Sequence, residues 1–409
     1  MSETILKVNK NECTACGVCA FLCPTSAIHM KEDEYGCKYP KILEKDCISC
    51  GACLKKCPTQ SDWLWDSKPN KVYAAWNKNS DERRHAASGG IATAMYQYAL
   101  NHGIKTFGVV YEPNQEAKYI EIKDEADIVR CRNSKYVFSD ITTVLPNIKE
   151  YIKRGEKVLL IGLPCQLAGV LSCVGGRADN LILVDIVCHG TCPAAYLNQH
   201  INYIEEKTKN KTTQMFFRDP EYGTNKFVFS LYQDENMFYK RGVHMDDTYQ
   251  IGYHKALFYR ENCYHCKYAQ PQRVGDITIS DFSGLGQCEP VTFERRFVSC
   301  VMISSPRGEC FWNALNSEGK VESYLRPSEE AFRYEKQLKQ PSVPHKKRSI
   351  FLKAYSIAGD FEKAAKKAVF EDAIKNMIAH YLRVERTKSV ISRCVPKAVK
   401  QYIKRLVRK

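Results

Sequence analysis

The first 60 residues contain a duplicated cysteine loop, and no other feature of the sequence constrains the fold as strongly. Each copy has three cysteines separated by two residues, then a fourth cysteine followed by proline, and the second copy begins 34 positions after the first. The first copy is Cys13, Cys16, Cys19 and Cys23, and the second is Cys47, Cys50, Cys53 and Cys57. Three cysteines at this spacing can bind one face of a [4Fe-4S] cube through soft thiolates. The duplication therefore predicts two [4Fe-4S] clusters within residues 1–60.

The fourth ligand of each cluster must come from outside its own triplet. In the bacterial two-cluster arrangement, the cysteine before the proline binds the cluster of the other loop. This arrangement assigns Cys57 to the first triplet and Cys23 to the second. Zinc is the alternative metal, but duplicated triplets followed by Cys-Pro fit a zinc site poorly. Cys37 lies outside both patterns and is expected to be a bystander thiol.

The remaining composition is that of an ordinary soluble chain. The 409 residues are 44% hydrophobic and 26% charged, which suits two or three globular domains. The opening residues 1–10 lack the apolar core of a secretory signal, so we expect a cytoplasmic protein whose 20 cysteines are reduced and largely metal-binding. The longest apolar runs are much shorter than the roughly 18 to 20 residues that span a bilayer, so no transmembrane helix is expected.

The pattern after a short linker at residues 60–71 indicates a mixed domain over residues 72–335. Helices and strands alternate at first, and then four strands follow without a clear helical pattern between them. The expected helices are Ile91–Leu100, Thr142–Lys153 and Ala194–Glu206, and the expected strands are Thr106–Tyr111, Val158–Gly162, Leu181–Cys188, Met215–Arg218, Phe227–Tyr232, Asp276–Ser280 and Val298–Ser304. With the N-terminal ferredoxin-like module, the predicted fold class is α+β.

The C-terminal residues 336–409 are predicted to form a basic helical tail. Residues 341–409 carry 18 Lys and Arg against 5 Asp and Glu, which is +13 of the net charge of +15. Helices are expected at Phe361–Phe370 and Asp372–Val384, and a basic amphipathic helix after Pro396, with an apolar stripe from Val399 to Val407. Such a helix either packs on the body or attaches the protein to the inner face of the cytoplasmic membrane. Nucleic-acid binding is not expected, because the basic residues lack interleaved aromatics.

Six short motifs in the central domain occur in an order typical of one known family. They are Ser88-Gly89-Gly90, Asn133-Ser134-Lys135-Tyr136, the segment Gly162 to Gln166, Cys188-His189-Gly190, Cys263-Tyr-His-Cys266, and the segment Gly275 to Phe282. Over residues 72–310 this set resembles the beta-subunit family of coenzyme F420 hydrogenases and dehydrogenases. The sequence departs from the family at Ser283, where tryptophan is usual, and this departure weakens the transfer of substrate identity.

The resemblance implies a flavin-binding domain and an oxidoreductase. Family members bind FAD and iron-sulfur clusters, and some carry a fused two-cluster ferredoxin. The function then expected is electron transfer between ferredoxin-type carriers and a small-molecule hydride donor or acceptor, such as reduced coenzyme F420, through FAD. The alternative is a non-catalytic electron-transfer subunit that feeds a partner enzyme.

Four further cysteines of the central domain are candidate metal ligands. Cys165 and Cys188 fall at the carboxyl ends of predicted strands, where α/β folds gather their chemistry, and Cys263 with Cys266 forms a two-residue clip. Zinc and inert buried thiols are both compatible with this set. The resemblance favours a third [4Fe-4S] cluster.

The same resemblance implies a flavin-binding site. Ser88, Gly89 and Gly90 precede a predicted helix, whose N-terminal N–H groups and dipole suit a phosphate, although such a turn is also an ordinary helix cap. Lys135 beside Ser134 offers a cation and a hydroxyl to the same cofactor, or is simply a solvated lysine. No catalytic acid or base is assigned.

Overall fold

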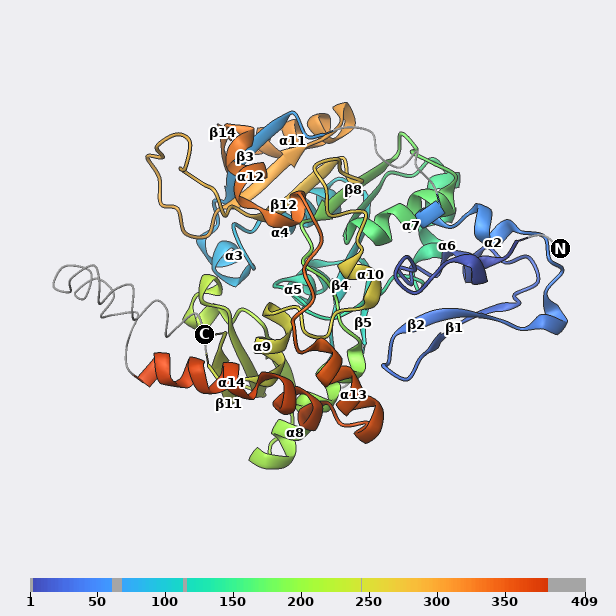
Figure 1. The fold of residues 1–409 in the computed structure, drawn as a ribbon. Coiled ribbons are helices and arrows are strands. Elements are labelled where there is room, and N and C mark those ends of the chain that lie inside the picture. Colours follow the sequence, from blue (N-terminus) through green and yellow to red (C-terminus); the bar gives the residue numbers. More distant parts are fainter. Residues whose placement is uncertain (1–2, 61–67, 113–115, 244, 382–409) are drawn as a thin grey trace.

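The computed structural model describes residues 3–60, 68–112, 116–243 and 245–381, and it divides this part of the chain into three packed regions (Figure 1). An N-terminal module lies at one end of a large mixed sheet. A smaller sheet with its own helices lies on the other side. The architecture is therefore α+β, as predicted.

The N-terminal module consists of two very short helices and a β-hairpin. The hairpin pairs β1 with β2 in an antiparallel register from Ile28–Ile42 to Glu32–Lys38. The elements of the module are η1 (Ile5–Lys7), α1 (Val18–Phe21), β1 (Ile28–Glu32), β2 (Lys38–Ile42), η2 (Glu44–Asp46), α2 (Ala52–Lys55) and η3 (Pro58–Gln60).

The central sheet has nine strands in the order β14-β3-β13-β12-β8-β7-β4-β5-β6. Its middle, from β12 through β8 and β7 to β4, is parallel, whereas β13, β3 and β14 on one side are antiparallel. The strands are β3 (Lys71–Asn77), β4 (Lys105–Val110), β5 (Ala117–Ile122), β6 (Ser139–Asp140), β7 (Val158–Gly162), β8 (Leu181–Ile186), β12 (Ile277–Asp281), β13 (Ser299–Ile303) and β14 (Val321–Arg326).

Helices cover both faces of this sheet, which explains why its middle strands are apolar without alternation. In β7, Val158 and Leu160 pack with α6 and α7 on one face, whereas Leu159 and Ile161 pack with α4 and α11 on the other. The helices of this region are α3 (Ser80–His85), α4 (Ile91–Asn101), α5 (Glu125–Cys131), α6 (Leu145–Lys153), α7 (Pro164–Val174), α11 (Pro306–Ser317), α12 (Ser328–Tyr334) and η6 (Lys336–Leu338).

The third region packs around an aromatic core that includes Tyr196, Tyr249 and Phe361. Its antiparallel sheet has the order β11-β10-β9. Its elements are α8 (Ala194–Thr208), β9 (Gln214–Phe216), η4 (Pro220–Tyr222), η5 (Thr224–Lys226), β10 (Val228–Gln233), β11 (Asn236–Gly242), α9 (Thr248–His254), α10 (Glu261–Tyr264), α13 (Arg348–Ala358) and α14 (Phe361–Tyr381).

Several local predictions need correction. The interval 215–304 is not free of helices, because it contains α9 and α10; the side chains of α9 are almost all buried, so its sequence shows no amphipathic period. The predicted helix at residues 142–153 begins only at Leu145. The two predicted helices after residue 361 are one continuous helix, α14, as far as the described residues extend. This helix and α13 pack into the aromatic core, and the amphipathic segment after Pro396 lies outside the described residues.

Candidate functional site

The two N-terminal cysteine loops have the same backbone conformation. Each short helix begins at a glycine in the left-handed region, Gly17 with φ 74° and Gly51 with φ 72°. A side chain at Gly17 would also collide with Thr142 Cγ2, 2.1 Å from an ideal Cβ. Gly17 is therefore required by its positive φ and by the contact of the module with the central domain.

The eight cysteines of the module form two groups, each drawn from both loops. Cys23 lies in a common cavity with Cys47, Cys50 and Cys53. Cys57 lies with the first triplet: burial, together with the nearby thiols of Cys57 and Cys13, raises the pKa of Cys16 to about 12. The grouping is the one that the bacterial arrangement requires, and the ligand role of each cysteine stays a prediction.

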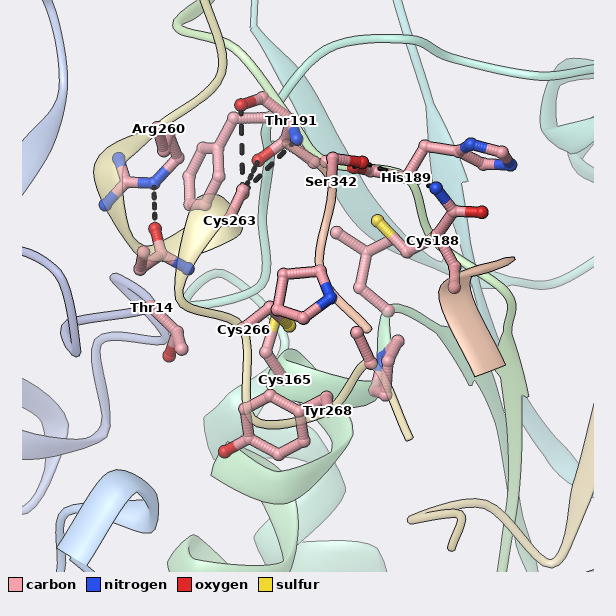
Figure 2. A pocket seen from close by; sticks show the side chains of 18 of the residues that line it. Thr14, Cys165, Cys188, His189, Thr191, Arg260, Cys263, Cys266, Tyr268 and Ser342 are labelled. Atoms are coloured by element: carbon pink, nitrogen blue, oxygen red, sulfur yellow. Dashed lines mark hydrogen bonds between the residues drawn. The ribbon is translucent and has the colours of Figure 1, made fainter. Parts of the chain in front are cut away.

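The four central cysteines line one cavity beneath the N-terminal module (Figure 2). Cys165 lies in the first turn of α7, Cys188 follows β8, Cys263 lies in α10, and Cys266 follows α10. The cavity measures about 570 Å³ with its open mouth included. Tertiary packing thus brings together four thiols that are separated by up to about 100 residues in the sequence.

The lining of this cavity contains a buried cation as well as the thiols. Arg273 is 2% exposed, and its Nη2 has no hydrogen-bond partner in the described part of the chain, although it lies 3.3 Å from Asp185 Oδ1. Burial raises the pKa of Cys266 to about 11, while the charge of Arg273 acts to lower it. A buried guanidinium in the lining of a cavity with four thiols suits an anionic group with several acceptor atoms, such as a thiolate-ligated iron-sulfur cluster.

The first N-terminal group and the central group are neighbours. Thr14, between Cys13 and Cys16, lines the central cavity. An ideal Cβ on Gly169 of α7 would lie 2.8 Å from Cys16 Cβ, so this triplet packs directly on the helix that carries Cys165. The first group thus lies next to the central group, whereas the second group includes the exposed Cys50.

His189 lies in the lining of the same cavity, but its side chain does not face the thiols. Figure 2 shows its ring turned away from the cysteines. Burial lowers the pKa of His189, and the charge of Arg218 lowers it further, whereas Glu335 and Asp281 raise it. His189 therefore belongs to the side of the site where Arg218 and Asp281 lie.

The Ser-Gly-Gly turn is held closely by its neighbours. Ser88 Oγ donates to Val298 O at 3.1 Å, and the Gly89 N–H donates to Ser299 Oγ at 2.9 Å. An ideal Cβ on Gly89 would lie 2.5 Å from Ala75 O, and Gly90 caps α4 with φ 82°. Packing against β3 and β13 is thus sufficient to explain Gly89, and its N–H is already used, so the proposed phosphate contact of this turn stays a prediction.

The side-chain nitrogen of Lys135 is held by backbone carbonyls, so Lys135 is not an ordinary solvated lysine. Its Nζ donates to Arg132 O at 2.5 Å and to Arg130 O at 3.2 Å, so it caps the C-terminal end of α5. Burial lowers its pKa to about 8. The backbone N–H of Ser134, which precedes Lys135, donates to Asn133 Oδ1 at 2.8 Å.

Arg218 joins these segments, and the sequence analysis did not identify it. Its Nη1 donates to Ala87 O at 2.7 Å, immediately before Ser88, and its Nε donates to Tyr136 Oη at 2.6 Å, immediately after Lys135. Both terminal nitrogens contact the Asp281 carboxylate at the end of β12. Two of the family-like motifs and the residue that precedes a third therefore meet at one guanidinium, which nothing in the local spacing of Arg218 indicates.

Comparisons with known proteins agree with this architecture. A 4Fe-4S dicluster domain model matches residues 12–61. The models for the coenzyme F420 hydrogenase/dehydrogenase beta subunit match residues 72–146 for its N-terminal part and residues 155–326 for its C-terminal part. The fold and the cysteine-rich module define an iron-sulfur electron-transfer oxidoreductase. Within that class, the chain belongs to the coenzyme F420 hydrogenase/dehydrogenase beta subunit family.

A solved structure of the F420-reducing [NiFe] hydrogenase complex from Methanosarcina barkeri is also similar to this chain. The sequences are 19% identical, the TM-score is 0.43, and the match covers 75% of this chain and 93% of the other. No curated protein matches the chain. No helix in the described residues is both long enough and apolar enough to cross a membrane.

Proposed function

We propose that this chain is an iron-sulfur flavoprotein oxidoreductase that transfers electrons between ferredoxin-type carriers and an organic hydride donor or acceptor. The observation that carries this proposal is the set of three cysteine groups, which extends from the exposed Cys50 to the cavity lined by Cys165, Cys188, Cys263 and Cys266. Clusters at such positions would connect the surface to the interior of the proposed flavin-binding domain.

The central group suits a third [4Fe-4S] cluster better than zinc. Four thiolates around one zinc ion at about 2.3 Å would place their sulfurs within about 4 Å of one another. In the described residues, no group of three or more His, Cys, Asp or Glu side chains is arranged to hold a single metal ion. The buried guanidinium of Arg273, which lines the same cavity, also favours a group that offers several acceptor atoms.

FAD is the proposed partner of this central site, and when bound it supplies the conversion between single electrons and a hydride. Ser88, Gly89, Gly90, Ser134 and Lys135 are the proposed binding residues. The contacts of Arg218 support this choice, since they hold both segments beside Asp281 and so define one shared surface. The charges of Asp281 and Arg218 also reach His189, which follows the proposed ligand Cys188.

The family description supports reduced coenzyme F420, or another small hydride carrier, as the organic substrate. The experiment offers reduced F420, NADH and reduced ferredoxin separately to purified anaerobic protein while flavin absorbance is followed. Bleaching by one organic donor and by ferredoxin supports the oxidoreductase. A flavin that none of the three bleaches favours the alternative, a subunit that feeds electrons to a partner enzyme without binding a small substrate.

The localisation we propose is cytoplasmic, with peripheral attachment of the basic C-terminal segment to the inner face of the cytoplasmic membrane. Five cations between Lys400 and Lys409 flank the apolar stripe of that segment. Each Lys or Arg near an anionic leaflet contributes about 1 kcal/mol, so five are sufficient for reversible binding.

A further inference from the structure

Arg260 is a buried arginine between the first N-terminal cysteine group and the central group. Arg260 is 1% exposed and lines the cavity of the central cysteines (Figure 2). From this position its Nη2 reaches the N-terminal module, with Cys13 O at 3.4 Å and Lys38 O at 3.2 Å. One guanidinium therefore contacts the module and the central cavity together.

No carboxylate in the described part of the chain forms an ion pair with Arg260. The guanidinium lies over the rings of Tyr39 at 5.2 Å and Phe138 at 4.9 Å, and its Nε donates to the neutral amide oxygen of Asn262 at 3.3 Å. By contrast, nearby Arg348 has its own carboxylate, Glu261, at 3.0 Å. A buried cation without a countercharge is costly, so its anionic partner must be supplied in another way.

The positive charge of Arg260 lies between two cysteine groups. Arginine stays protonated in proteins, and Arg260 contacts the carbonyl of Cys13 on one side and lines the central cavity with Cys263 on the other. Cys13 belongs to the first N-terminal group and Cys263 to the central group. The same cation therefore acts on a proposed ligand of each cluster.

We propose that Arg260 is the shared counter-cation of the first N-terminal cluster and the central cluster, and that it raises the reduction potentials of both. This inference rests on the proposed clusters. A fixed cation in a low-dielectric site stabilises the reduced form of a cluster, which is the more negative one. Arg260 acts through the clusters as a positioning and tuning residue, and it contacts no substrate.

The test is an anaerobic redox titration of the loaded protein, followed by EPR, with two variants. Arg260→Gln removes the cation, and Asn262→Asp places a carboxylate at the Nε contact while keeping the guanidinium. In both, we expect the reduction equilibrium of the two flanking clusters to become about tenfold less favourable, or about 59 mV lower for one electron. The cluster of Cys23, Cys47, Cys50 and Cys53 should keep its potential.

Two controls separate charge from packing. Arg348→Gln, which removes an arginine near Cys263 that already has a carboxylate partner, should change neither potential by more than about twofold in its equilibrium constant, or about 18 mV. Arg260→Lys should keep both potentials near those of the parent. Unchanged potentials in a fully loaded Asn262→Asp protein would overturn the proposal.

If the Arg260→Gln protein fails to incorporate its clusters, the iron content of Arg260→Lys decides the question. Full iron content in Arg260→Lys would then show that the charge is what matters, whereas equal failure of the Lys variant would show that the shape of the guanidinium matters and would refute the inference. The titration needs neither flavin nor substrate. The titration can therefore refute the role of Arg260 while flavin bleaching supports the proposed function, and the opposite combination is equally distinguishable.

Discussion

Arg218 and Asp281 form a bidentate ion pair, with Nη2 to Oδ2 at 2.7 Å and Nη1 to Oδ1 at 3.1 Å. Arg218 follows β9 and Asp281 ends β12, so the pair connects the small sheet to the large one. The Arg218 side chain is 10% exposed, and its guanidinium carbon lies 4.0 Å from the centre of the Phe227 ring. The ion pair is therefore shielded from solvent on the arginine side. Such pairs fix geometry as well as charge.

The first prediction concerns this pair. Asp281→Asn should leave the iron content unchanged and weaken FAD binding about tenfold, because a charge-assisted hydrogen bond worth about 1.5–3 kcal/mol no longer holds the three segments together. Equilibrium dialysis against FAD, with iron measured on the same samples, checks it. Asp234→Asn, in the turn between β10 and β11, is the matched control and should bind FAD like the parent.

Gly89→Asp would place a carboxylate at the proposed phosphate contact, but it is a poor test of the flavin-binding site. Any side chain at Gly89 meets Ala75 O and the Ser299 N–H at 2.5 and 2.7 Å, so loss of flavin would follow from disrupted packing alone. Lys135→Gln is cleaner, since it removes charge at the end of α5 with little change in volume. Unchanged FAD affinity in both Lys135→Gln and Asp281→Asn would argue against this site.

The second prediction is metal content. Reconstituted protein should contain about twelve irons per chain, and Cys266→Ser should lower this to about eight while the N-terminal clusters persist. Iron and acid-labile sulfide analysis measures the change, and Cys310→Ser, at an exposed cysteine of α11, should lose none. A parent protein with about eight irons and one zinc would exclude the third cluster, and iron near zero would exclude the whole interpretation.

The third prediction tests how the two loops share ligands. Cys57→Ser and Cys13→Ser should remove the same EPR signal of the reduced protein, and Cys23→Ser and Cys50→Ser should remove the other, because each group draws its fourth cysteine from the opposite loop. If Cys57→Ser instead matches Cys50→Ser, each loop binds its own cluster through four of its own cysteines.

The fourth prediction concerns a buried histidine far from the cysteines. His200 Nε2 lies 3.0 Å from Asp247 and Nδ1 lies 2.5 Å from Glu362, which joins α8 to α14. Burial opposes its charge, but the two carboxylates raise its pKa to about 10, above the ordinary 6.5. Its stabilising effect is thus fully present below pH 6.5 and is lost as pH rises toward 10.

Thermal unfolding of the loaded protein between pH 6 and 9 measures this effect. The midpoint should fall with pH, and His200→Gln should flatten the dependence and cost about 3–5 kcal/mol near neutral pH, because it leaves two buried carboxylates unpaired. His102→Gln, at a histidine whose side chain is 47% exposed, should behave like the parent. An equal slope in the parent and His200→Gln would show that another group titrates.

The fifth prediction concerns the basic segment outside the described residues. The full chain should cosediment with anionic liposomes at low salt and much less at high salt, and a chain truncated after Arg393 should not cosediment at either. Neutral liposomes are the control. Binding that ignores the truncation or the salt would contradict an electrostatic anchor at this end of the chain.

Features that depend on local spacing were predictable from the amino-acid order alone. A cysteine every third residue places three thiols on one turn of chain, so the iron-sulfur module was predictable, and so were strands such as β7, whose apolar run has no other stable place than inside a covered sheet. Strands with half-exposed faces, such as β11 and β14, gave no such pattern and were missed.

The sites shared by distant residues emerge from packing between separate elements. Arg218 and Arg260 have no sequence pattern, because their roles come from contacts with segments about 60 to 250 residues away. The predicted basic tail likewise begins as part of the body, since Phe351 and Phe361 of α13 and α14 are completely buried in the aromatic core. Spacing along the chain specifies which groups can meet within one turn or one strand, whereas burial and charge pairing between separate elements arise only when the chain is folded.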